Sequence, residues 1–212
     1  MIEPIAILGG TFDPVHIGHL RVALEASEVL DAPVRLMPAH VPPHRSAPVA
    51  NPAQRVAMLR ASLAGQDHLQ LDTRELDRSE LSYTVDTLRQ MRGEFGAERS
   101  LILLLGADAF AGLTTWHEWR ALFDLAHIAV MTRPGHDTRL PAELATEIAS
   151  RRTRSATDLH TSPCGKLFDL PVTPLEISAS VVRALLAAGR DPRWLVPDAL
   201  LADPGLLAPY RS

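Results

Sequence analysis

Two histidines, His16 and His19, stand three residues apart, shortly after the glycine pair that ends the first apolar segment of the chain. Residues at this spacing share one face of a helix, so both imidazoles are expected to point the same way. An imidazole can donate an N–H to a phosphate oxygen, and its charged form can neutralise negative charge that builds up on a leaving group. Gly18 lies between them and removes side-chain bulk. The pair therefore favours phosphate chemistry.

The glycine pair belongs to a turn, Gly9-Gly10-Thr11, between an apolar run and an expected helix. The order strand, glycine turn, helix is typical of phosphate-binding sites, because backbone N–H groups can approach the oxygens and a helix N-terminus favours negative charge. The turn has neither the G-x-G-x-x-G spacing of dinucleotide-binding folds nor the G-K-[ST] ending of a P-loop. A different phosphate cradle is indicated, and a NAD-dependent dehydrogenase is disfavoured.

The histidine pair has two other interpretations. A His-x-x-His pair at helical spacing could be half of a metal site, but zinc would need a third ligand and Asp13 is the only nearby candidate. Either histidine could also be an ordinary surface or core residue. We predict phosphate contact by both and no dedicated metal site.

Short apolar runs predict the strands that would carry these residues. The runs cover residues 5–8, 34–37, 101–105 and 127–131. Two of them are nearly continuous, as expected for parallel strands with helices over both faces. A further strand is expected near 166–172.

Helical spacing of apolar residues fills the segments between these runs. A helix over about 18–30 is expected to place Leu20, Ala23, Leu24 and Val29 along one stripe. Further helices are expected from Asn51-Pro52 onward and over about 84–95, 141–152, 178–188 and 196–201.

Alternation of strand and helix over residues 1–135 predicts an α/β fold, a Rossmann-like, doubly wound and mostly parallel sheet with a small C-terminal helical subregion. The weakly patterned stretch 151–165 is expected to be a mobile loop. We predict one domain over 1–212, with nucleotide-binding sheet and helices over 1–175 and the helical subregion over 176–212. Ligands of such sheets bind beyond the carboxyl ends of the strands, where strand order reverses, so the first turn is the expected site.

The formal net charge is −4 and the pI about 6.1, so no overall positive field would attract nucleic acid or an anionic membrane. Lys166 is the only lysine beside twenty arginines, which leaves little room for a lysine-dependent mechanism. The single cysteine, Cys164, cannot form an intrachain disulfide, and no segment has the pattern of a signal peptide or a membrane span. A cytoplasmic protein is expected, and the sequence predicts no particular oligomeric state.

The stretch from Gly9 to His19 resembles the signature of the nucleotidyltransferase superfamily, whose members share a His/Thr-x-Gly-His motif. Within that superfamily the chain is similar to the bacterial nicotinate-nucleotide adenylyltransferases along nearly its whole length. The other segments that carry the likeness are Val41-Pro42-Pro43-His44-Arg45, Ser82-Tyr83-Thr84, Gly106-Ala107-Asp108, Trp116, Arg133-Pro134-Gly135 and Ile177-Ser178-Ala179-Ser180-Val181-Val182-Arg183. The family often has lysine at the position of Arg45, and an aromatic residue can stand where this chain has His117.

The resemblance implies roles for individual residues, with His16 and His19 as the catalytic pair. The implied ATP-binding residues are Gly9, Gly10, Thr11, His16, His19, Gly106, Asp108, Ile177, Ser178 and Arg183. The implied residues on the nicotinate mononucleotide side are His44, Arg45, Tyr83, Thr84, Trp116 and Arg133. Mg²⁺ would arrive with ATP, held mainly by phosphate oxygens and water.

Several of these residues also have plain structural interpretations when the resemblance is set aside. Ser178 suits a helix N-cap and Arg183 a solvated helix surface. Asp108 suits a helix cap, and Trp116 could be a core residue.

The reaction implied by the resemblance is transfer of the adenylyl group of ATP to nicotinate mononucleotide, by direct in-line attack. The products would be nicotinate adenine dinucleotide and pyrophosphate, a step of NAD biosynthesis. Two alternatives stay open. One is another adenylyltransferase of the superfamily, acting on phosphopantetheine or nicotinamide mononucleotide, and the other is a nucleotide-binding module without turnover.

Overall fold

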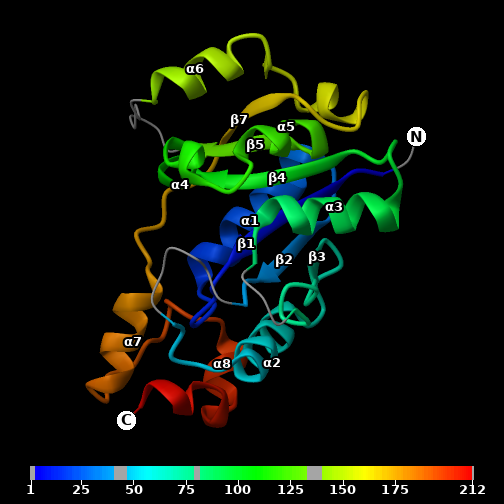
Figure 1. The fold of residues 1–212 in the computed structure, drawn as a ribbon. Coiled ribbons are helices and arrows are strands. Elements are labelled where there is room, and N and C mark those ends of the chain that lie inside the picture. The colour runs from blue at the N-terminus through cyan, green and yellow to red at the C-terminus, as the bar shows by residue number, and fades with distance from the viewer. Residues whose placement is uncertain (1–2, 41–46, 79–81, 133–139, 212) are drawn as a thin grey trace.

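The computed structural model describes residues 3–40, 47–78, 82–132 and 140–211. A parallel sheet organises these residues (Figure 1), with the strand order β3-β2-β1-β4-β5-β7-β6. The strands are β1 Ile5–Gly10, β2 Val34–Pro38, β3 Leu69–Leu71, β4 Leu101–Gly106, β5 His127–Thr132, β6 Arg152–Thr153 and β7 Leu167–Pro171. The predicted α/β class and the five predicted strands are confirmed, and β3 and β6 are additions.

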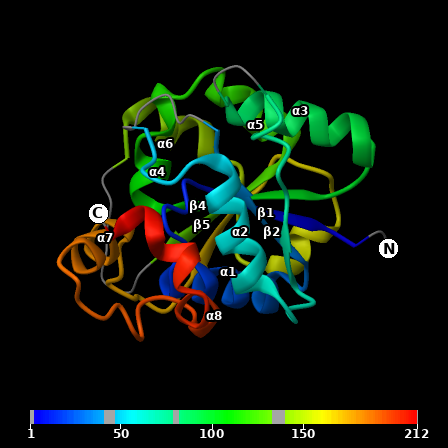
Figure 2. The same cartoon turned by 90° about the horizontal axis from the view of Figure 1, so that it is seen from below.

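Helices cover both faces of the sheet, and Figure 2 shows α1 and α3 on opposite sides of it. The α-helices are α1 Ile17–Leu30, α2 Pro52–Leu63, α3 Thr84–Phe95, α4 Ala107–Ala111, α5 Leu122–Leu125, α6 Ala142–Ile148, α7 Ala179–Ala187 and α8 Asp198–Ala202. The 3-10 helices are η1 Leu113–Thr115, η2 Trp119–Ala121, η3 Ala156–His160 and η4 Pro204–Tyr210. No helix of the described part of the chain is long and apolar enough to cross a membrane.

Alternate residues of each central strand face two separate apolar cores, because side chains along a strand point to opposite faces. In β1, Ile5 and Ile7 join the core under α3 and α5, whereas Ala6 and Leu8 join the core under α1. Strand β4 divides in the same way. These strands are therefore buried on both faces, which explains their nearly continuous apolar sequence.

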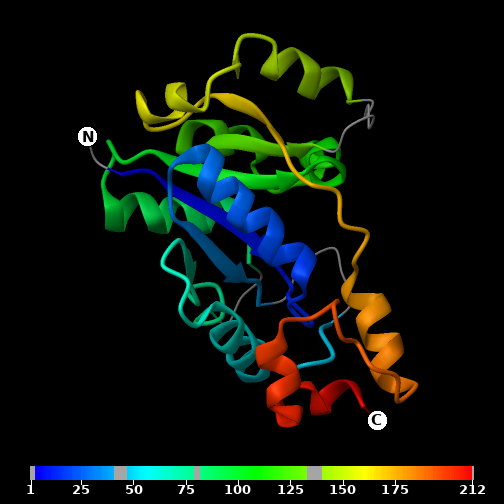
Figure 3. The ribbon, with the colours of Figure 1, turned by 180° about the vertical axis from the view of Figure 1, so that it is seen from behind.

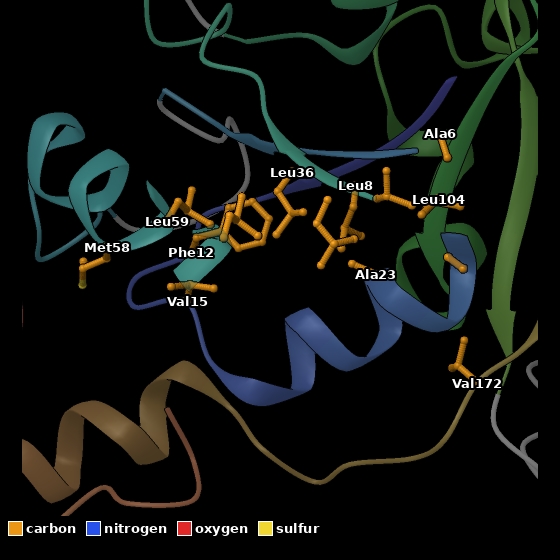
Figure 4. Packing of buried hydrophobic residues seen from close by; sticks show 14 of the residues in the cluster. Ala6, Leu8, Phe12, Val15, Ala23, Leu36, Met58, Leu59, Leu104 and Val172 are labelled. Carbon is orange, nitrogen blue, oxygen red and sulfur yellow. The ribbon is translucent and has the colours of Figure 1, made fainter. Parts of the chain in front are cut away.

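The core under α1 reaches the C-terminal end of the chain. It includes residues of α2, α7, α8 and η4, so the segment 176–212 packs on the same core as the sheet. In the close view of Figure 4, Phe12 of the first turn lies with Leu36 of β2 and Leu59 of α2 in this cluster. Apolar packing of Phe12 against this core therefore holds the first turn in place.

The expected stripe of α1 is partly wrong. Ala23 is buried, but Val29 is 42% exposed. The buried residues of α1 are Gly18, Ala23, Ala26, Ser27 and Leu30. Small residues occupy most of this face, and Leu20 of the expected stripe is partly buried against the same core.

The expected mobile loop over 151–165 is also wrong. It contains β6 and η3, and Leu159 is fully buried. The Ser100 hydroxyl donates to the Leu159 carbonyl at 2.7 Å, and Nη2 of Arg92 donates to the Pro163 carbonyl at 2.7 Å. The expected helix over 141–152 ends earlier, at Ile148, because the chain turns there into β6.

His127, the first residue of β5, holds the C-terminal end of the stretch 151–165 through two hydrogen bonds. Its ring is fully buried, Nδ1 accepts the backbone N–H of Lys166 at 3.0 Å, and Nε2 lies 2.8 Å from the Ser162 carbonyl. Since Nδ1 is an acceptor, the neutral ring carries its proton on Nε2 and donates it to Ser162. Burial lowers the pKa of His127 to about 4, so the ring is neutral at pH 7.

Candidate functional site

The candidate site lies at the carboxyl ends of β1 and β4. From β1 the chain builds β2 and β3 on one side, and it then returns to place β4 on the other side of β1. Leu8 of β1 is in register with Leu104 of β4, so Gly9-Gly10 and Gly106 follow at the same edge of the sheet. This is the point where strand order reverses, the position at which such sheets bind ligands.

The turn after β1 is held tightly by Phe12. Its backbone has φ 49°, and its ring is 1% exposed. A Cβ at Gly10 would lie 3.0 Å from that ring, so any larger residue there would push against the buried Phe12 side chain. A bulky residue in the left-handed region persists only where its surroundings hold it, and such backbone is typical of ligand sites.

The two histidines meet at the start of α1. His16 is the N-cap residue of the helix, and its ring stacks on that of His19 with centroids 3.6 Å apart and planes at 24°. The backbone N–H of His16 lies 3.3 Å from Nδ1 of His19. Because Nδ1 accepts this bond, neutral His19 carries its proton on Nε2, the atom that can donate to a ligand. The prediction that both rings lie together is confirmed.

His16 is buried and electrically neutral. The residue is 6% exposed, and desolvation lowers the pKa of His16 to about 4. Nδ1 of His16 has no hydrogen-bond partner within the described ranges. A buried ring nitrogen without a partner is costly, and a phosphate oxygen is a group that could satisfy it through an N–H.

Gly18 sets the space that the His16 ring occupies. A Cβ at position 18 would lie 3.1 Å from Nδ1 of His16 and 3.6 Å from the Cβ of Ile177. We expect Gly18→Ala to push the ring from its stacked position and, with the ATP that the family resemblance implies as substrate, to lower kcat/KM about tenfold, since small displacements of a positioning group are costly. Steady-state kinetics with ATP varied would measure this. Gly93→Ala is the matched control, because a Cβ at that helical position meets nothing within 4 Å.

Asp13 joins the turn to distant parts of the chain and is 5% exposed. Its carboxylate accepts the backbone N–H groups of Val49 at 2.8 Å and Ala50 at 2.9 Å, and the hydroxyl of Tyr210 at 2.7 Å. Nη1 of Arg183 donates to the Asp13 carbonyl at 2.7 Å and lies 3.8 Å from its carboxylate. These contacts commit Asp13 to the scaffold, which weakens its interpretation as a third metal ligand.

Arg55 of α2 lies beneath the turn with no exposed surface. Its Nη1 donates to the carbonyls of Thr11 at 2.8 Å and Ala39 at 2.9 Å. Burial lowers the pKa of Arg55, and the nearby Asp13 carboxylate opposes that shift. The guanidinium stays charged, so it adds positive charge directly under the first turn.

The segment from Ile177 to Arg183 also contacts the first turn and the start of α1. Ile177 lies beside Gly18, and Ser178 is the N-cap of α7, where its hydroxyl accepts the N–H of Val181 at 3.3 Å. Arg183 of α7 donates a hydrogen bond to the Asp13 carbonyl. The cap interpretation of Ser178 is confirmed, and the structure brings Arg183 to the His16 turn across a large sequence separation.

Across the β1–β4 edge, Gly106 is the N-cap of α4 and Asp108 stands exposed in its first turn. The carboxylate of Asp108 is therefore open to a ligand at the carboxyl end of β4. Its role toward a ribose stays a prediction.

The residues expected for the second substrate gather at the start of α3. Tyr83 is the N-cap of α3 and Thr84 its first residue. The ring of Tyr83 lies 4.6 Å from that of His117, and Trp116, half-buried, packs on the same core as Tyr83. Three of the predicted residues thus share one region. His44, Arg45 and Arg133 lie outside the described residues.

Sequence reasoning missed the network under the turn. No sequence motif marks Arg55 or Tyr210, and the sequence suggests Asp13 only as a candidate metal ligand. An arginine between apolar positions of an amphipathic helix was the one available signal, because Arg55 shares the buried face of α2 with Met58 and Leu59. No local pattern marks Tyr210.

Comparison with known proteins agrees with this arrangement. A family model described as cytidylyltransferase-like matches residues 7–185. A protein of Marinobacter nauticus named as a nicotinate-nucleotide adenylyltransferase is 47% identical over 193 residues, 91% of this chain and 89% of the relative. A protein of Pseudomonas aeruginosa with the same name is 48% identical over 203 residues, 95% of this chain and 94% of the relative.

Solved structures share the fold at lower identity. Plasmodium falciparum nicotinic acid mononucleotide adenylyltransferase complexed with NaAD matches with a TM-score of 0.68 and 17% identity, covering 94% of this chain and 95% of that chain. The same enzyme complexed with APC matches with a TM-score of 0.67 and 15% identity, covering 96% of this chain and 97% of that chain.

Proposed function

The chain belongs to the cytidylyltransferase-like family and, within it, to the nicotinate-nucleotide adenylyltransferases, and from this premise we propose the reaction and the part that its residues play. The protein transfers the adenylyl group of ATP to nicotinate mononucleotide and releases pyrophosphate, a step of NAD biosynthesis. The stacked pair His16 and His19 at the strand-order reversal, joined there by Arg183, is the observation that carries this proposal.

The chemistry needs positioning more than proton transfer. An oxygen of the nicotinate mononucleotide phosphate bonds to the α-phosphorus of ATP, and the bond from that phosphorus to the bridging oxygen breaks, so pyrophosphate leaves. A phosphate monoester has a second pKa of about 6, so the nucleophile is already mostly dianionic at pH 7. A general base is unnecessary, and holding the reactants in line with stabilisation of charge supplies the rate.

The first turn provides that stabilisation. His19 presents Nε2–H to the phosphates, and His16 supplies a second ring donor from its buried position. The guanidinium groups of Arg55 and Arg183 both lie near the Asp13 carboxylate. Positive charge therefore exceeds negative charge beneath the turn. Binding of an anionic phosphate would favour the charged form of His16 over the neutral form it has without ligand.

The Tyr83 region receives nicotinate mononucleotide. Trp116 offers an aromatic face to the pyridine ring, and the backbone N–H groups at the start of α3 suit its carboxylate. Gly106 and Asp108 are assigned to the ribose of ATP. His44, Arg45 and Arg133 keep their assignment to the second substrate from the sequence alone.

Magnesium is assigned to ATP itself. Over the described part of the chain, no three side chains of His, Cys, Asp or Glu gather in a way that could hold a metal ion. We assign Mg²⁺ to phosphate oxygens and water, the ligands that this cation usually keeps when it binds with a nucleotide. We also assign the reaction to the cytoplasm, where nucleotide substrates are supplied.

A paired assay tests the proposal. Wild-type protein is given ATP with nicotinate mononucleotide, nicotinamide mononucleotide or phosphopantetheine at equal concentration, and pyrophosphate release is measured. The highest kcat/KM is expected with the nicotinate substrate. A preference for either other acceptor would assign the chain to another adenylyltransferase, and ATP binding without product would make it a binding module.

A further inference from the structure

We propose that Tyr210 is a positioning residue for the phosphate site, acting through the buried carboxylate of Asp13 on Arg183 and the first turn. This inference rests on the proposed function, because it concerns how ATP is held. It gives η4, at the far end of the chain, a part in ATP binding that neither the sequence motifs nor the family likeness assigns.

The geometry of Asp13 carries the argument. One carboxylate oxygen accepts the Tyr210 hydroxyl at 2.7 Å and the Ala50 N–H at 2.9 Å, and the other accepts the Val49 N–H at 2.8 Å. Arg183 is tied to the same residue by a 2.7 Å bond to its carbonyl. The Nη1 atom that makes this bond also lies 3.8 Å from the Asp13 carboxylate, so both the backbone and the side chain of Asp13 help to place the Arg183 guanidinium.

The balance of charge makes the hydroxyl of Tyr210 important. Asp13 is 5% exposed and Tyr210 3% exposed, so their bond lies out of contact with water. Burial and the bond to Asp13 raise the pKa of Tyr210, so its hydroxyl stays a donor throughout the working range. The Tyr210 hydroxyl is a neutral donor, so it holds the carboxylate in place while the negative charge of Asp13 stays available to attract Arg183.

The surrounding packing places Tyr210 in the core next to the first turn. Figure 3 shows η4 beside α2, α7 and α8, and its Leu207 and Tyr210 belong to the core under α1. A second contact joins the same end of the chain to the site, because the Leu195 carbonyl accepts the N–H of Ile17, the first residue of α1, at 2.9 Å. The C-terminal region thus holds both ends of the segment 13–17, which contains His16.

The test is Tyr210→Phe, which keeps the ring and removes the hydroxyl. We expect KM for ATP and the dissociation constant of ATP, measured by calorimetry in magnesium buffer without the second substrate, to rise about tenfold, because small displacements of the groups that position a ligand are costly. KM for nicotinate mononucleotide should change less than twofold. ATP binding is independent of turnover, so failure of the proposed function would be recognised separately, as wild-type protein that makes no dinucleotide.

Two controls separate positioning from stability. Leu207→Val removes buried apolar volume from the same 3-10 helix without touching Asp13, and it should lower Tm while leaving ATP binding unchanged. On an Asp13→Asn background, Tyr210→Phe should add no further loss of ATP affinity. The proposal is overturned if ATP binding survives Tyr210→Phe, if Leu207→Val weakens it equally, or if the two losses at Tyr210 and Asp13 simply multiply.

Discussion

A His19→Ala variant is expected to lose at least about 100-fold in kcat for dinucleotide formation. Removal of one preorganised donor from a charge-stabilising site typically costs 10²–10³-fold in kcat. The ring of His19 also stacks on His16 at 3.6 Å and meets Phe12 edge-on at 5.0 Å, so its loss releases the neighbouring donor. The measurement is steady-state turnover at saturating ATP and nicotinate mononucleotide, with circular dichroism to check the fold.

His68→Ala is the matched control for this variant, because His68 is an exposed histidine just before β3. It should keep wild-type kcat. His19→Asn, which retains one N–H donor, should recover part of the loss. A reduction of less than about tenfold in His19→Ala, equivalent to roughly 1.4 kcal/mol of barrier, would remove His19 from the catalytic assignment.

His127 is expected to make the fold sensitive to acid. The pKa of His127 is about 4 in the folded protein, below the ordinary 6.5 that the unfolded chain should show. Between these values the unfolded state binds more protons, so stability rises with pH across this window and is lost as pH falls through it. The contribution is fully present above pH 6.5, and about 3 kcal/mol of unfolding free energy is lost by pH 4.

Urea unfolding of wild type and His127→Gln at several pH values measures this contribution. The variant should be less stable than wild type at pH 7, because the ring joins Lys166 to Ser162 through two hydrogen bonds. It should also lose less stability than wild type between pH 6.5 and 4. His68→Gln, at an exposed position, should keep the wild-type slope. Equal slopes for wild type and His127→Gln would refute the assignment.

Local patterns in the sequence predict much of the fold. The apolar runs at β1, β2, β4, β5 and β7 were recognisable because buried parallel strands need apolar side chains on both faces. Capping residues also predict where two helices begin. The Asn51 side chain accepts the N–H of Gln54 at 2.9 Å at the start of α2, and Ser178 caps α7. These signals act over a few residues, so they survive without tertiary information.

Elements too short to show a period were missed. Strand β3 has three residues, and α4 and α5 have five and four, too few for amphipathic spacing to appear. The stretch 151–165 looked unstructured because its order depends on partners elsewhere, such as Ser100 and His127. Tertiary contacts overrode weak local preference there.

The sequence by itself determined the α/β class, the first turn and the paired placement of His16 and His19, because strand burial and helical spacing are local consequences of residue type. Only the tertiary structure decided what supports that turn. Arg55 and Tyr210 contribute from 44 residues beyond Thr11 and 197 beyond Asp13, respectively. Hydrogen bonds of this kind depend on which elements the core brings together, and no spacing along the chain encodes them.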